Sequence, residues 1–186
     1  MKRYEIGLFI GSLRRDSINR RLATALKRLA PPELGFTEIA IGDLPLYNQD
    51  HEIVGGLPAG VQRMKEALEP VQGVLFVTPE YNRSVPGVLK NALDWASRPK
   101  GANSVAGKAG AVCGAAPGAI GTAAGQQHLR TVLAALDVHT MGQPEFYLQF
   151  TPDLISMDGQ VHNEGTQAFL RQFMQAYAGW VRRLCG

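Results

Sequence analysis

The sequence is poor in cysteine, with only Cys113 and Cys185 among its 186 residues. Neither cysteine belongs to a C-x-x-C pair or lies at the spacing of a metal site, so we predict no disulfide framework and no zinc centre. Cys113 ends an apolar run that is typical of a strand. We therefore expect it to be a small buried hydrophobic side chain rather than a nucleophile.

Long apolar runs are missing as well. No stretch approaches the roughly 20 apolar residues that cross a bilayer, so we predict no transmembrane helix. The short apolar run at residues 6–10 is followed directly by the polar segment 11–16. That arrangement fits a first strand better than a secretion signal, and it favours a cytoplasmic protein.

The sequence also lacks blocks of like charge. The formal net charge is +3 and the pI about 9.0, which suits small anionic or phosphorylated ligands. A basic chain could also suit nucleic acid, but the run of lysine and arginine that such binding leads one to expect is absent. The composition, 45% hydrophobic and 19% charged residues, is that of a globular protein that can bury a core.

Strand-like apolar runs alternate with helical patterns along the whole chain, without a repeat, a low-complexity segment or a linker. The expected strands are residues 4–10, 36–41, 73–78, 108–113 and 138–147. The expected helices are residues 19–29, 61–68, 88–97, 121–136 and 164–184, and residues 42–60 form a turn-rich stretch. This alternation predicts a single α/β domain over residues 1–186, with a five-stranded parallel sheet between two layers of helices.

Right-handed crossovers leave few strand orders for such a sheet, and 2-1-3-4-5 is one of the two common ones. Ligands of these sheets bind outside the carboxyl ends of the strands, where the strand order reverses. For the order 2-1-3-4-5, the binding loops are those after the first, third and fourth strands. They correspond to residues 11–19, 78–86 and 114–121.

The loop after the first strand reads Gly-Ser-Leu-Arg-Arg-Asp-Ser-Ile-Asn, at residues 11–19. A phosphate group needs free backbone N–H groups, the positive end of a helix and a few hydroxyl or guanidinium donors, and this segment offers all of them. It is neither a Walker loop nor a G-x-G-x-x-G fingerprint. The alternative is an ordinary serine-capped turn with solvated arginines; the position after the first strand favours phosphate binding.

The loop after the third strand carries two prolines, Pro79 and Pro86, which give it a stiff, extended course. Such a loop can hold the backbone N–H groups of Glu80, Tyr81 and Asn82 in fixed positions, as a flavin ring requires at its polar edge. The alternative is a proline-bounded loop that leads into a core helix.

At residues 11–19 and 78–95 the chain resembles the NAD(P)H-dependent FMN reductase family, which includes bacterial chromate and quinone reductases. The second segment, Thr-Pro-Glu-Tyr-Asn-Arg-Ser-Val-Pro-Gly-Val-Leu-Lys-Asn-Ala-Leu-Asp-Trp, is long and specific, and similarity extends over essentially the whole chain. The resemblance implies a three-layer flavodoxin-like fold, non-covalently bound FMN and NAD(P)H as the reducing co-substrate. It further implies a homodimer or a dimer of dimers that reduces quinones, flavins or related small acceptors, chromate and azo compounds included, by ping-pong hydride transfer through flavin N5.

The resemblance also implies which residues bind FMN. For the phosphate end these are Ser12, Arg14, Ser17, Ile18 and Asn19, and for the ring they are Pro79, Glu80, Tyr81, Asn82, Arg83 and Ala116. Many relatives carry a hydroxyl residue in the loop that closes the site, whereas Ala115 and Ala116 offer backbone contacts only. We assign no catalytic side chain and no metal ligand, because the cofactor carries the chemistry.

Two other functions remain open at this point. A flavodoxin-type electron carrier is disfavoured because such carriers are usually acidic, and a flavin-binding regulatory module without turnover stays possible. Arg14 and Arg15 would also suit the extra phosphate of NADPH, and the four histidines are scattered and fit structural or solvated positions. Trp95 fits either a subunit interface or the core, and Lys90 and Asp94 fit surface or interface charges.

Overall fold

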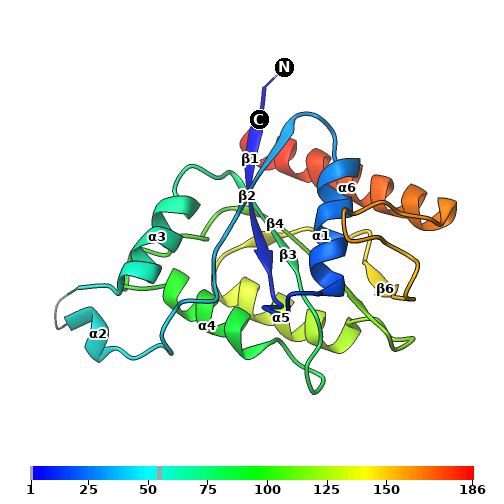
Figure 1. Ribbon diagram of the computed structural model, residues 1–186. Helices are drawn as coiled ribbons and strands as arrows, with labels where there is room; N and C mark the ends of the chain where they lie inside the picture. Colours follow the sequence, from blue (N-terminus) through cyan, green and yellow to red (C-terminus); the bar gives the residue numbers. More distant parts are fainter. Residues whose placement is uncertain (1, 54–55) are drawn as a thin grey trace.

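The computed structural model describes residues 2–53 and 56–186 (Figure 1). In that part of the chain the strands are β1 (Tyr4–Ile10), β2 (Leu34–Glu38), β3 (Gly73–Val77), β4 (Ala109–Ala116), β5 (His139–Thr140) and β6 (Tyr147–Gln149). The helices are α1 (Ile18–Leu29), α2 (Asp50–Ile53), α3 (Ala59–Leu68), α4 (Gly87–Ala96), α5 (Ala123–Ala135) and α6 (Glu164–Cys185). Across these described residues, no helix combines the length and the apolar character that a bilayer crossing requires.

The strands form one sheet in the order β2-β1-β3-β4-β5, and β6 pairs with the end of β4. Every pairing is parallel. The predicted strand order and the three-layer flavodoxin-like architecture are therefore confirmed. The order reverses between β1 and β3, which places the carboxyl ends of these two strands beside each other.

Alternating side chains of the central strands build two separate cores. Ile6 and Leu8 of β1 point to the layer formed by α1 and α6, whereas Phe9 points to the layer formed by α3, α4 and α5. On that second face Phe9 stacks on Phe76 of β3, with ring centroids 4.8 Å apart. Figure 1 shows the two helical layers on opposite sides of the sheet. This period of two is what a doubly covered strand requires.

Three strand predictions differ from the structure. The second strand, expected at residues 36–41, is β2 and covers Leu34–Glu38, because its register against β1 pairs Leu34 with Tyr4 and Glu38 with Leu8. The fourth strand does not stop at residue 113 but continues to Ala116, because β6 supplies it with a partner: Gly114 faces Tyr147 and Ala116 faces Gln149. The single strand expected at residues 138–147 is instead divided into β5 and β6. Gly142 and Pro144 lie in the interruption, and proline has no N–H group for a sheet hydrogen bond.

The stretch at residues 42–60 was predicted to be rich in turns, and its residues 54 and 55 lie outside the described part of the chain; the segment around Pro45 is tied to α4. Trp95 is fully buried, and its Nε1 donates to the Pro45 carbonyl oxygen at 2.8 Å; the Asn91 side chain donates to the same oxygen at 2.9 Å. Trp95 therefore belongs to the core, and its interpretation as an interface residue is wrong. The short helix α2 was not expected. Its residue Glu52 forms an ion pair with Arg98 through two hydrogen bonds of 2.7 and 2.9 Å. This hydrogen bonding lowers the pKa of the Glu52 carboxyl group.

Lys90 and Asp94 form an ion pair with each other on the exposed side of α4, with the Nζ atom 2.7 Å from the nearer carboxylate oxygen. This is the i, i+4 spacing at which helical side chains meet. The interpretation of both residues as surface charges agrees with this geometry.

Candidate functional site

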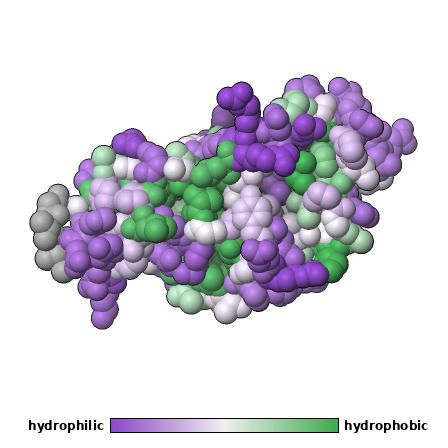
Figure 2. Space-filling view, turned by 60° about the horizontal axis from the view of Figure 1, so that its bottom comes forward, coloured by the Kyte–Doolittle hydropathy of each residue, from purple (hydrophilic) through white to green (hydrophobic). Residues whose placement is uncertain are grey.

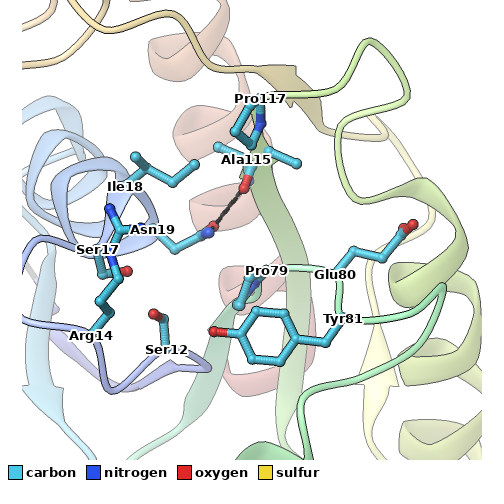
Figure 3. Close-up of a pocket in the computed structure, with 11 residues that line it drawn as sticks. Ser12, Arg14, Ser17, Ile18, Asn19, Pro79, Glu80, Tyr81, Ala115 and Pro117 are labelled. Atoms are coloured by element: carbon cyan, nitrogen blue, oxygen red, sulfur yellow. Dashed lines mark hydrogen bonds between the residues drawn. The ribbon is translucent and has the colours of Figure 1, made fainter.

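A cavity of about 210 Å³ lies at the carboxyl ends of β1, β3 and β4, where the three predicted loops meet (Figure 3). Its lining residues are Ser12, Arg14, Ser17, Ile18, Asn19, Pro79, Glu80, Tyr81, Ala115, Ala116 and Pro117. Nine of the eleven residues predicted to bind a ligand are in this lining, and Asn82 and Arg83 are not. Ala115 and Pro117 line the cavity as well; both belong to the predicted ligand loop at residues 114–121, from which only Ala116 was assigned individually to FMN binding.

The end of the cavity near α1 is suited to an anion. The Ser17 hydroxyl caps α1 by accepting the Arg20 N–H at 3.3 Å, and no acidic residue lies in the first turn to offset the positive end of the helix. Ser12 is buried, and its side chain points into the cavity in Figure 3. Arg14 is exposed at the rim, where its guanidinium group donates to the Asp16 carbonyl oxygen at 2.7 Å. The start of α1, the two serine hydroxyl groups and the Arg14 guanidinium group together fit a phosphate.

Asn19 joins the start of α1 to the end of β4. Its side-chain Nδ2 donates to the Ala115 carbonyl oxygen at 2.9 Å, and its Oδ1 accepts the Ala115 N–H at 2.9 Å (Figure 3). Ala115 needs this partner because β3 ends at Val77, which pairs with Cys113. The Asn19 amide thus takes the place of a neighbouring strand in the wall of the cavity.

The loop at residues 78–86 forms a tight turn on one side of the cavity. Tyr81 and Ser84 exchange two backbone hydrogen bonds of 3.1 and 3.0 Å, and the two residues between them have positive φ angles, 51° at Asn82 and 65° at Arg83. The turn carries these two residues to an exposed tip, which explains why they do not line the cavity. It also corrects one expectation: the Tyr81 N–H is bonded to the Ser84 carbonyl oxygen and is not free for a ligand.

The N–H groups of Glu80 and Asn82 differ in this respect, since neither has a hydrogen-bond partner among the residues that the structure describes. The loop also packs closely on β4. A Cβ atom at Gly114 would lie 2.1 Å from the Thr78 carbonyl oxygen, so only glycine permits this approach. The site therefore offers two open backbone donors on a loop held against the sheet.

Cys113 lies next to Gly114 on β4 and is completely buried. Burial raises the pKa of its thiol far above the usual range, so the thiol stays neutral and is not a nucleophile. The prediction of a small buried hydrophobic side chain is confirmed.

Comparison with known proteins finds relatives that are all described as reductases or oxidoreductases. The family model described as NADPH-dependent FMN reductase matches residues 4–153. A 2-hydroxy-1,4-benzoquinone reductase from a Burkholderia species is 49% identical over 178 residues, which is 96% of each chain. A quinone reductase from Pseudomonas putida is 44% identical over 179 residues, which is 96% of this chain and 95% of the relative. The structure of FerB, a flavoenzyme NAD(P)H:(acceptor) oxidoreductase from Paracoccus denitrificans, has a TM-score of 0.92 and 42% identity, and the match covers 97% of this chain and 98% of FerB.

The Asn19 amide pair gives a prediction about stability. Asn19→Ala leaves the N–H and the carbonyl group of Ala115 unpaired at a buried position, so we expect the free energy of unfolding to fall by about 2–3 kcal/mol. Ser17→Ala, which removes only the cap two residues earlier, is expected to cost about 1 kcal/mol. Urea unfolding of both variants measures the two free energies. Equal losses of stability would contradict the proposal that the Asn19 amide holds the end of β4.

Proposed function

Because the chain belongs to the NADPH-dependent FMN reductase family, we propose that it is an FMN-containing enzyme that uses NAD(P)H to reduce quinones, free flavins or related small acceptors. The observation that carries the proposal is the cavity: it combines an anion-binding helix end with a loop of open backbone donors. Two of the relatives are a 2-hydroxy-1,4-benzoquinone reductase and a quinone reductase, and this supports quinones as the acceptor class. We treat residues 1–186 as one FMN-binding domain.

The residues present fit FMN. The phosphate would be held by Ser12, Arg14 and Ser17 at the start of α1, with Ile18 and Asn19 beside it. The ring would lie against Pro79, Glu80 and Tyr81 on one side and the segment 115–117 on the other. Common ligand sites have volumes of about 300–1,000 Å³. This cavity is smaller, so part of the ring would extend past the mouth of the cavity. Asn82 and Arg83, which do not line the cavity, would contact the ring only in its part outside that mouth.

FMN, when bound, would supply the redox chemistry: it would accept a hydride from NAD(P)H at flavin N5 and pass two electrons to an acceptor. For a quinone the balance is NAD(P)H, one proton and quinone to NAD(P)⁺ and hydroquinone. The protein's own residues bind and orient. No side chain needs to act as nucleophile or general acid, and the neutral Cys113 beneath the site is not a candidate.

We further propose that the protein is a cytoplasmic homodimer or dimer of dimers. The segments that follow β1, β2, β3 and β4 each carry a large, exposed apolar side chain; these are Leu13, Leu46, Tyr81 and Ile120, with exposed fractions of 58%, 82%, 50% and 53%. Figure 2 shows apolar side chains scattered over the face at this end of the molecule. A second copy placed there would remove them from water.

The function is tested by adding FMN to the purified protein and following NAD(P)H absorbance. We expect continuous consumption of NADH or NADPH when a benzoquinone is added, and parallel lines in double-reciprocal plots, because donor and acceptor use the same place in turn. A protein that is colourless and takes up no FMN would contradict the proposal. An electron carrier would bind FMN but would not consume NAD(P)H without a partner protein.

The phosphate end is tested by Ser12→Asp. The new carboxylate would repel the FMN phosphate, so we expect the Kd for FMN to rise at least about tenfold. Riboflavin lacks the phosphate and serves as the internal control, with its Kd unchanged within about twofold. Fluorescence quenching measures both constants. An equal rise for FMN and riboflavin would show that Ser12 does not face the phosphate.

The assembly is tested by Leu46→Asp, which places a charge among the exposed apolar side chains. We expect a dimeric wild type and a variant shifted to monomer in sedimentation velocity runs. Met157→Asp is the matched control, since Met157 is 57% exposed but lies on the segment that precedes α6. A monomeric wild type, or dissociation by both changes, would contradict the proposed interface.

A further inference from the structure

The side chain of Glu80 is directed to α5 rather than to a ligand. It is only 10% exposed, and its Oε2 atom accepts the backbone N–H of Gly125 at 2.9 Å. Its other oxygen, Oε1, lies 3.7 Å from the Arg83 guanidinium group. Both carboxylate oxygens thus have a partner within the protein, although Glu80 lines the cavity.

Helix α5 needs this carboxylate. The first N–H groups of a helix have no partner within it and require acceptors from elsewhere. Thr122 stands at the cap position of α5 but makes no capping hydrogen bond with its side chain, and the first turn contains no acidic residue. Glu80 supplies both missing features from a distant loop, an acceptor for a first-turn N–H and a negative charge at the positive end of the helix.

The loop and the helix meet at two points. At Gly125, an added Cβ atom would lie 3.0 Å from the Ser84 carbonyl oxygen and 3.3 Å from Glu80 Cγ, so the glycine permits the close approach. One turn further along α5, the Nδ1 atom of His128 lies 3.1 Å from the Ser84 hydroxyl oxygen. The tight turn at residues 81–84 is therefore held near both of its ends by the same helix.

We propose that Glu80 is a positioning residue for the flavin: by capping α5 with its side chain, it fixes the loop whose backbone N–H groups would bind the ring. The inference rests on the proposed function, since it takes FMN as the ligand. Its physical basis is preorganisation. A loop that is already held in place loses little freedom on binding, whereas a loose loop must be ordered at the expense of affinity.

The test compares two substitutions that remove the same charge. Glu80→Gln keeps an oxygen that can accept the Gly125 N–H, whereas Glu80→Ala removes the acceptor. We expect the Kd for FMN to rise about tenfold in the alanine variant and to stay within about threefold in the glutamine variant. The matched control is Glu33→Ala: Glu33 is similarly buried, with 12% exposure, but pairs with Arg182 next to the amino end of β2. The control should bind FMN like the wild type.

Two further readouts separate positioning from charge and from misfolding. If Glu80 acted through its charge, both variants would change the Kd and the flavin midpoint potential equally, and that result would overturn the proposal. Amide hydrogen exchange at Gly125, measured without FMN, should accelerate in the alanine variant and remain slow in the glutamine variant. Unchanged exchange in both would also overturn it.

Gly125→Ala provides an independent check, because it leaves Glu80 in place but pushes the loop away from α5. We expect it to weaken FMN binding about as much as Glu80→Ala. A wild type that binds no FMN would refute the proposed function and this inference together. A wild type that binds FMN, with all variants equal to it, would refute only the role of Glu80.

Discussion

The shape of the site depends on the pair of hydrogen bonds between the Asn19 side chain and the backbone of Ala115. Asn19 lies in the first turn of α1, so it fixes the start of that helix and the loop before it. Ala115 lies near the end of β4, where the neighbouring strand β3 has already ended. The amide closes the sheet at this edge, and it thereby sets the distance between the first and the third loop of the cavity.

Most of the fold could be predicted from the sequence because the patterns that indicate strands and helices are local. The alternation in β1, with Ile6 and Leu8 on one face and Phe9 on the other, needs only neighbouring residues to be recognised. The continuous apolar run in β3 likewise indicates a strand covered on both faces. Once five strands and intervening helices are predicted, topology places the ligand loops without further information.

The parts that could not be predicted depend on contacts between distant segments. The end of β4 consists of Gly114, Ala115 and Ala116, which have little strand preference of their own. It is extended because β6 pairs with one of its edges and the Asn19 side chain with the other. The turn at residues 81–84 holds two non-glycine residues at positive φ, which no turn motif in the sequence signals. For the same reason no sequence pattern indicated that the Tyr81 N–H would be used within the loop.

The role of Glu80 is the clearest example of this limit. A glutamate in a predicted flavin loop suggests a side chain that faces the ligand, and only the structure shows its carboxylate on the N–H of Gly125. Asn19 and Glu80 have similar effects. Asn19 ties the loop before α1 to the end of β4, and Glu80 ties the loop after β3 to α5, which lies on the other face of the sheet from α1. Both use side chains to fix backbone that would contact FMN. In such a site the backbone groups that would recognise the cofactor are held in position before it binds. Backbone that is already ordered loses little freedom on binding, so such a site would favour the cofactor that its backbone groups fit.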